Sequence, residues 1–352
     1  MIPWVLVPAT VAAGLLEWPA LARFLLAGAA LIPVAVVLGE ATEQLSARLG
    51  PVAAGLLNAT CGNAAELIIA VLALRRGLVA VVQASISGSI VGNLLLVLGA
   101  AMVAGGARRK VQRFAPLAAE SQLGSLALAV FALVLPAVFF HLAQLSHRED
   151  LTEPLSVTVA VVLLVVYGAA LLFSLKTHHH LLGGADESGF PRWSARRAVV
   201  TLIGAGLATA IVSEVLVASV EEVGRGLGLG PVFMGMVVIA VLGNAAEHAA
   251  AVFLAWRDKM DAALSICFAS SLQVALFVTP VLVLASFSLG HPMTLVFSAV
   301  EVIAVAVSVG LAGLLTLNGE SNWLEGVQLL ALYVILAACL ALLPAAEALR
   351  PL

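Results

Sequence analysis

The sequence predicts an all-α, multi-pass membrane protein composed of two related halves. Apolar residues make up 62% of the 352-residue chain, charged residues make up only 11%, and the mean hydropathy is +1.13. A water-soluble protein of this size exposes far more polar surface. Apolar runs of about 20 residues, the length that crosses the hydrocarbon core as a helix, recur along the chain. A five-residue segment also occurs twice, at 62–66 and 243–247, which indicates a duplication.

We expect about eleven membrane-spanning helices, because the charged residues gather in short breaks between eleven apolar runs. The first run is short, but it lacks a basic start and a small-residue cleavage site, so we expect a retained helix. The expected spans are 3–17, 20–40, 51–74, 79–104, 115–141, 155–175, 196–219, 231–255, 261–285, 293–316 and 323–344.

The distribution of lysine and arginine predicts the orientation of these helices. Of the 17 basic residues, 11 fall in loops that follow even-numbered spans. Basic loops stay in the cytoplasm, so we expect a cytoplasmic N-terminus and a C-terminus outside. We call the two sides of the molecule the even-loop face and the odd-loop face, after the spans that their loops follow.

The chain divides into a first helix, two five-helix repeats and a linker. The repeated segments lie 181 positions apart, and the same offset relates Ser89 to Ser270 and Glu120 to Glu301. Five spans separate the two copies, so spans 3 and 8 cross the membrane in opposite directions and the repeat is inverted. The expected units are a first helix at 1–18, a first repeat at 19–177, a cytoplasmic linker at 178–194 and a second repeat at 195–352.

The repeated segment, Gly-Asn-Ala-Ala-Glu, introduces polar groups at a depth where a bilayer tolerates few of them. Asn-x-x-Glu after a glycine is also the pattern of a helix that restarts behind an N-cap. Backbone that is not helical is tolerated inside a membrane where it lines a polar cavity. We therefore expect broken helices at mid-membrane, at Gly62 and Gly243, and a site between them.

Glu66, Glu247, Asn63 and Asn244 are the expected ligands of a cation, because buried acids in membranes usually mark ion or proton pathways. Their oxygens are hard donors without matching His or Cys, which suits Ca²⁺ or Mn²⁺ better than Zn²⁺ or Cu²⁺. The three cysteines lie inside apolar runs and define neither a disulfide framework nor a metal site. A net charge of −3 gives no electrostatic basis for nucleic-acid binding.

Other polar residues within the spans form a weaker group of pathway candidates. Buried amides need partners, whereas single serines in membrane helices commonly serve packing. Glu120 and Glu301, which are related by the repeat, lie nearer the membrane faces, where an acid can be solvated without taking part in a pathway. The weaker candidates are Gly62, Gly243, Gln83, Ser89, Asn93, Ser270, Gln273, Glu120 and Glu301.

Several segments resemble the calcium/proton antiporters, a cation/proton exchanger family within the calcium:cation antiporter superfamily. The resemblance is carried by residues 56–69, 83–99, 173–178, 243–249 and 321–326, and it covers nearly the whole chain. It implies a helix followed by two groups of five helices, and exchange of Ca²⁺ for protons.

The resemblance also implies that the repeated glutamates bind the cation beside the repeated asparagines, and that Gln83 and Gln273 line the pathway. The chain departs from the family pattern at Ser265 and Ala269, where glycines are usual, and at Gly92, where a serine is common. These departures bear on ion preference.

The charge balance of the site favours competition between cation and proton. Two ionised carboxylates neutralise one divalent cation, and protonation discharges the pair once the cation has left. The expected substrates are Ca²⁺ and H⁺. The expected location is a prokaryotic cytoplasmic membrane. No cofactor is expected, and homo-oligomerisation stays open.

Alternatives within transport are a Na⁺-driven or K⁺-dependent calcium exchanger and a Na⁺ or K⁺/proton antiporter. A Na⁺-driven exchanger needs ligands for the driving ion beyond two mid-depth acids. A channel fits less well, since an inverted repeat is typical of alternating access. An intramembrane enzyme needs a nucleophile–base pair or a motif such as His-Glu-x-x-His, and a retinal protein needs a mid-span lysine; the sequence offers neither.

Overall fold

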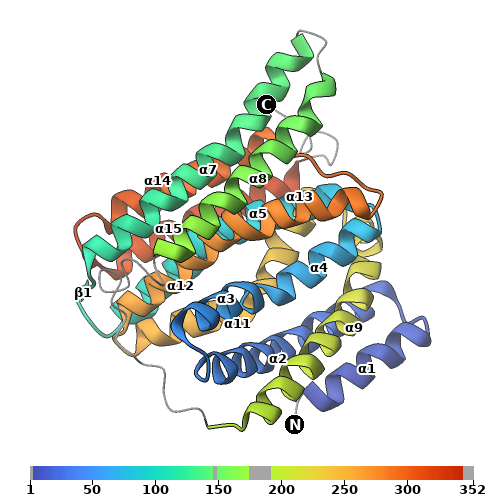
Figure 1. Cartoon of the computed structure of the whole chain (residues 1–352), viewed down its shortest axis with the longest axis horizontal. Coiled ribbons are helices and arrows are strands. Elements are labelled where there is room, and N and C mark those ends of the chain that lie inside the picture. Colours follow the sequence, from blue (N-terminus) through green and yellow to red (C-terminus); the bar gives the residue numbers. More distant parts are fainter. Residues whose placement is uncertain (1–2, 146–148, 174–191, 344–352) are drawn as a thin grey trace.

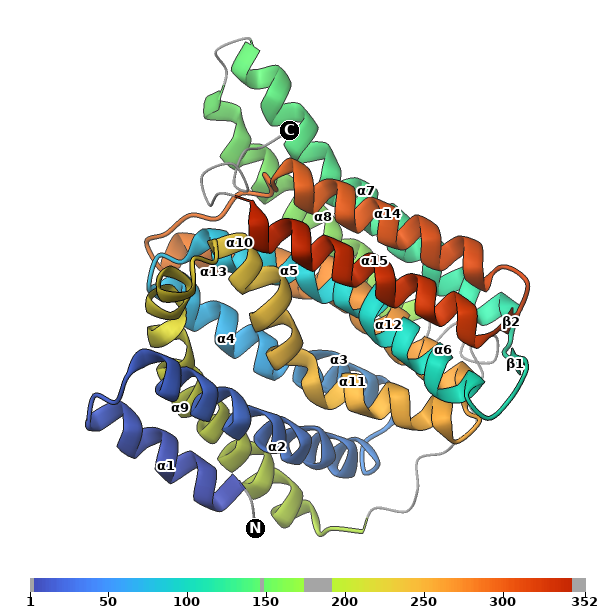
Figure 2. The same ribbon diagram turned by 180° about the vertical axis from the view of Figure 1, so that it is seen from behind.

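The computed structural model is almost entirely helical, as the hydropathy predicts (Figure 1, Figure 2). It describes residues 3–145, 149–173 and 192–343, so most of the predicted linker lies outside the described residues. The first half contains α1 Pro3–Leu15, α2 Ala20–Ser46, α3 Pro51–Cys61, α4 Ala64–Arg75, α5 Val79–Val91, η1 Gly92–Val97, α6 Leu98–Gly106, β1 Gln112–Arg113, α7 Pro116–Leu145, η2 Glu149–Leu151 and α8 Thr152–Leu172. The second half contains α9 Ala195–Leu227, α10 Pro231–Phe233, η4 Met234–Ile239, α11 Ala240–Trp256, α12 Met260–Gln273, η5 Val274–Val278, α13 Thr279–Ser288, α14 Ala299–Thr316, β2 Glu320–Ser321 and α15 Trp323–Leu342.

Each expected span corresponds to one helix or to a run of consecutive helices. Nine stretches of the described residues are long and apolar enough to cross a membrane, judged by length and composition. The other two expected spans are α1, which has 13 residues, and the broken pair α3–α4. The protein is thus an all-α, multi-pass membrane protein, and eleven crossings stay a prediction.

Around the repeated segment, the two halves depart from regular α-helix at different places. In the first half, α3 ends at Cys61 and α4 begins at Ala64, so the break predicted at Gly62 is present. A Cβ at Gly62 would lie 2.6 Å from the Asn58 carbonyl oxygen, a contact that only glycine avoids. In the second half, the break predicted at Gly243 is wrong, because α11 continues through this residue.

One additional residue explains this difference. Gly62 lies 11 positions after Pro51, whereas Gly243 lies 12 positions after Pro231. A π-helical turn takes up one residue more than an α-helical turn. The second half contains such a segment, η4, just before α11. The extra residue is therefore absorbed before the repeated segment begins, and Gly243 enters α11 without a break.

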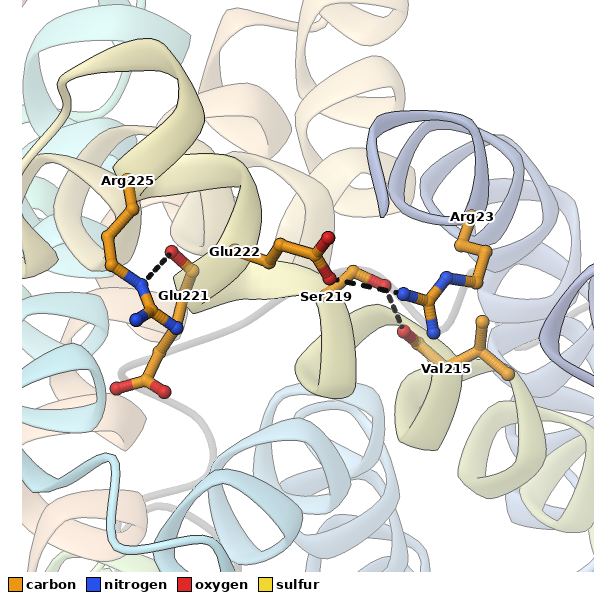
Figure 3. A network of polar contacts seen from close by, with 6 residues as sticks. All are labelled: Arg23, Val215, Ser219, Glu221, Glu222 and Arg225. Carbon is orange, nitrogen blue, oxygen red and sulfur yellow. Dashed lines mark hydrogen bonds and ion pairs between the residues drawn. The ribbon is translucent and has the colours of Figure 1, made fainter. Parts of the chain in front are cut away.

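Contacts between loops agree with the predicted alternation of spans. At the even-loop face, β1 pairs antiparallel with β2, and Arg109 Nε lies 2.9 Å from Asp258 Oδ1. At the odd-loop face, Arg23 Nη2 lies 3.2 Å from Glu222 Oε2 and ties the start of α2 to the end of α9 (Figure 3). Loops of the two halves thus meet on shared faces, as alternating spans require.

Helices of the two halves pack directly against one another. The long helices α2 and α9 lie side by side in both views (Figure 1, Figure 2). α5 packs closely against η4: a Cβ at Gly88 or Gly235 would collide with backbone of the facing segment. Small residues allow this approach in membranes. α5 and α11 contact each other, and each also contacts α4 and α12, so these four helices surround a common centre.

Candidate functional site

The two repeated segments meet at this centre. Gly243 on α11 faces Glu66 in the first turn of α4, and a Cβ at Gly243 would lie 3.9 Å from the Glu66 Cα. Glu247 follows Gly243 by four residues on α11 and so lies on the same helix face as this contact. Two segments 181 positions apart therefore contribute to one shared site, as the duplication predicts.

Glu66 belongs to a buried network with Ser89 and Asn244. Its side chain is buried, and its Oε1 accepts a hydrogen bond from the Ser89 hydroxyl. The same hydroxyl lies 2.9 Å from the Ser85 carbonyl oxygen, one helical turn away. Asn244 Nδ2 donates to Ser89 Oγ and to the Ala240 carbonyl, both at 3.0 Å. Through α5, the glutamate of the first copy is thus linked to the asparagine of the second.

Asn63 connects the α3–α4 break to α12. It stands at the N-cap position of α4, yet its side chain makes no cap hydrogen bond. Its Nδ2 instead donates to Gln273 Oε1 at 2.5 Å. The helix-cap interpretation of the repeated segment therefore does not account for this asparagine.

Four buried oxygens at the centre have no hydrogen-bond partner among the described residues. They are Asn63 Oδ1, Glu66 Oε2, Glu247 Oε2 and Ser270 Oγ. Buried polar atoms are normally paired, so four unpaired oxygens here indicate a ligand-binding site. Carboxylate, amide and hydroxyl oxygens suit a hard cation such as Ca²⁺. The described part of the chain has no cluster of three His, Cys, Asp or Glu, and the four unpaired oxygens belong to two carboxylates, one amide and one hydroxyl.

A cavity of about 560 Å³ leads from this centre toward the even-loop face. At the centre it is lined by Gly62, Glu247 and Gln273, and farther out by Glu43 near the end of α2 and Ala262 near the start of α12. Both of those outer residues lie close to loops of the even-loop face. Glu247 is therefore reached from this face, whereas the Glu66 side chain is buried.

The opposite side of the centre is packed. There α5 and η4 touch at Gly88 and Gly235, with no room for a Cβ on either residue. Position 269 is related to Gly88 by the repeat offset of 181, and Ala269 lines the open cavity. Related positions of the two halves are thus closed on one face and open on the other.

Three weaker candidates lie elsewhere or make other contacts. Gln83 Nε2 donates to the Thr294 and Val296 carbonyls, at 2.9 and 3.2 Å, and thereby holds the segment before α14. Asn93 is buried in η1 with an unpaired Nδ2. The Glu120 side chain lies outside what the structure describes, although its backbone belongs to α7.

Glu301 has a complete set of local partners. Its Oε2 accepts hydrogen bonds from the Ser298 backbone N–H at 2.8 Å and from the Ser298 hydroxyl at 2.7 Å, and its Oε1 accepts one from Ser87 at 2.7 Å. With Ser298 it forms the capping box of α14. This acid therefore has a structural explanation that Glu66 and Glu247 lack.

The structure adds residues that the sequence did not single out. Asn58 lines the cavity, and its Oδ1 accepts a hydrogen bond from Ser46 at 2.7 Å. Glu43, near the end of α2, lines the same cavity. The spacing in the sequence could have indicated Asn58, because it precedes Gly62 by four residues and so shares its helix face.

The fold defines a class: a multi-pass membrane protein whose two halves bring unpaired buried oxygens together at its centre. Comparison with known proteins then gives the family. The family model described as sodium/calcium exchanger protein matches residues 19–176 and 197–342. The chain belongs to this family.

Relatives and solved structures agree with this assignment. A Ca(2+)/H(+) antiporter of Aphanothece halophytica is 45% identical, covering 91% of this chain and 90% of that protein. The Ca(2+)/H(+) antiporter ChaA of Bacillus subtilis is 40% identical, covering 94% and 95%. Native YfkE superposes with a TM-score of 0.85 at 37% identity, covering 97% of this chain and 100% of that one. The H+/Ca2+ exchanger CAX, with a TM-score of 0.70 at 14% identity, shares the fold. The resemblance seen in the sequence is confirmed.

Proposed function

We propose that the chain is a secondary active transporter that exchanges Ca²⁺ for protons across a prokaryotic cytoplasmic membrane. The observation that carries this proposal is the group of four unpaired buried oxygens to which both halves contribute. Bacterial relatives that are named Ca(2+)/H(+) antiporters support the choice of ions.

In this proposal, Glu66 and Glu247 balance the charge of one Ca²⁺. Asn63 contributes its free Oδ1 and Ser270 its free Oγ. Asn244 Nδ2 is engaged by Ser89 and Ala240, so its amide oxygen is the atom available to the cation. Two charged and several neutral oxygens fit the six to eight oxygen ligands that Ca²⁺ usually takes.

Ser89 allows Glu66 to exist with and without a proton. When Glu66 is ionised, the Ser89 hydroxyl donates to its carboxylate. When Glu66 is protonated, the acid donates to Ser89 Oγ, and the serine proton turns to the Ser85 carbonyl, which lies 2.9 Å away. A hydroxyl oxygen has two lone pairs, so Ser89 still accepts from Asn244 in both states. The network therefore keeps its hydrogen bonds while protons and Ca²⁺ compete for the glutamate.

The unequal packing of the two halves supports alternating access as the transport mode. The cavity opens the site to the even-loop face, while α5 and η4 close it toward the odd-loop face. If the two halves exchange these arrangements, α12 closes the even-loop side and α5 separates from η4. The same two glutamates then meet the other compartment, and no separate proton route is needed.

The remaining candidates have different parts in this proposal. Gln273, bonded to Asn63, and Glu43, at the cavity mouth, belong to the route from the even-loop face. Gln83 and Glu301 hold the segments around α14 in place, and their hydrogen bonds support that role.

The test is uptake of ⁴⁵Ca²⁺ into liposomes that contain the purified chain, driven either by a pH gradient or by a Na⁺ gradient. We expect uptake with the pH gradient, loss of uptake when an ionophore collapses that gradient, and no response to Na⁺. Uptake driven by Na⁺ alone would instead identify a Na⁺-driven exchanger. Proton movement that depends on Na⁺ or K⁺ without Ca²⁺ would identify a monovalent cation/proton antiporter.

A further inference from the structure

A second concave feature lies outside the cation site, on the lateral surface between α6 and α11. This groove has a volume of about 650 Å³ and runs from Leu96 and His248 to Ala104 and Trp256. From residue 248 to residue 256, α11 rises about 12 Å, close to the half-thickness of the hydrocarbon core, about 15 Å. The groove thus spans nearly one leaflet and ends at the even-loop face.

The walls of the groove are apolar and open sideways. Apart from His248, its lining is made of alanine, aliphatic and aromatic side chains. Phe253 and Trp256 are 51% and 39% exposed. In a membrane, a sideways-open apolar groove faces acyl chains, and tryptophan is enriched where chains meet headgroups.

Two arginines stand at the mouth of the groove. The Arg108 guanidinium lies 3.8 Å from the centre of the Trp256 ring, and that of Arg257 lies 4.2 Å from the Phe253 ring. Neither guanidinium is in an ion pair among the described residues, whereas the neighbouring Arg109 is neutralised by Asp258. The rings that form the groove thus also hold two uncompensated positive charges at headgroup level.

We propose that the α6–α11 groove binds one anionic phospholipid, with its phosphate between Arg108 and Arg257 and an acyl chain along α11 as far as His248. The charge at the mouth matches an anionic headgroup, and the length and apolar lining match a chain of one leaflet. The groove occupies one side of α11, and the cavity containing Glu247 and Ala250 occupies another.

Native mass spectrometry of the purified full chain with added phosphatidylglycerol or phosphatidylcholine tests this inference. The informative variant is Arg108→Gln with Arg257→Gln, and the matched control is Arg192→Gln with Arg196→Gln, an equal charge change at the same face. We expect retained phosphatidylglycerol to bind roughly 30-fold more weakly in the first variant and unchanged in the control. Equal retention of both lipids by wild type, or no loss in the first variant, would overturn the proposal.

A second measurement leaves both arginines in place. Ala249→Leu narrows the groove but keeps the charges of Arg108 and Arg257. It should lower the retention of phosphatidylglycerol in the mass spectrum. In wild-type protein, phosphatidylglycerol with brominated chains should quench the Trp256 fluorescence, defined as the signal lost in Trp256→Phe, more strongly than brominated phosphatidylcholine. Equal quenching by the two lipids, or dimers in the mass spectrum that Ala249→Leu dissociates, would show a non-selective lipid boundary or a contact between copies instead.

Discussion

The Ser89 hydroxyl contacts the Glu66 carboxylate and is also 2.9 Å from the Ser85 carbonyl oxygen. It therefore has two alternative acceptors for one proton, and it accepts from Asn244 in either case. A carboxylate with a partner that adapts in this way can bind and release a proton while Ser89 and Asn244 keep their hydrogen bonds.

Replacing Ser89 with alanine removes this adaptation. We expect Ser89→Ala to lower proton-driven Ca²⁺ uptake about tenfold, because the Asn244 amide loses one of its two acceptors and Glu66 loses its donor. Ser87→Ala is the matched control, since Ser87 lies on the same helix but donates to Glu301. Initial uptake rates in liposomes give the comparison. Equal losses in both variants would mean that Ser89 serves packing alone.

The close contact of α5 and η4 predicts the effect of a single methyl group. Gly88→Ala places a Cβ against the Met236 carbonyl, so the packed side should loosen and a cysteine at buried Val81 should become reactive. The repeat-related change Ala269→Gly, on the open cavity wall, should leave that cysteine protected. Cysteine labelling in a background without native cysteines measures the reactivity of position 81 in both variants. Protection of this position in Gly88→Ala would contradict the proposal that the α5–η4 contact closes the odd-loop side.

The orientation in the membrane is open to a direct test. The excess of basic residues predicts that the loop at Asn318 is cytoplasmic and that the loop at His291 is outside. Both residues are exposed, so single cysteines at these positions should react with an impermeant reagent from opposite sides. Reaction of both from one side would refute the predicted topology.

Glu301 should tolerate loss of its charge better than the central glutamates. A glutamine can still form the capping box with Ser298, although the change weakens the bond to Ser87. We expect Glu301→Gln to cost about 1 kcal/mol of stability and to keep uptake within a few-fold of wild type. Complete loss of transport in a folded Glu301→Gln protein would place this acid on the pathway.

The sequence predicted the helical fold, the duplication and the residues that meet at the centre, because hydropathy and an exact repeat are local signals. It did not predict that α11 continues through Gly243, since a single inserted residue does not reveal whether it forms a break or a π-helical turn. Gln83 and Gln273 are both amides in apolar helices, yet one holds an extended segment and the other reaches Asn63. Only tertiary contacts distinguish them.

If one Ca²⁺ and protons compete for Glu66 and Glu247, removing either charge should stop exchange. We would measure ⁴⁵Ca²⁺ uptake by Glu66→Gln and by Glu247→Gln in liposomes across a range of pH, with exposed Glu221→Gln as control. Glutamine keeps the size of the side chain but holds neither the charge nor the exchangeable proton. We predict that both variants fold and lose exchange equally, and that Glu221→Gln transports like wild type. Uptake by Glu66→Gln at nearly the wild-type rate would show that Ca²⁺ and protons do not compete for Glu66.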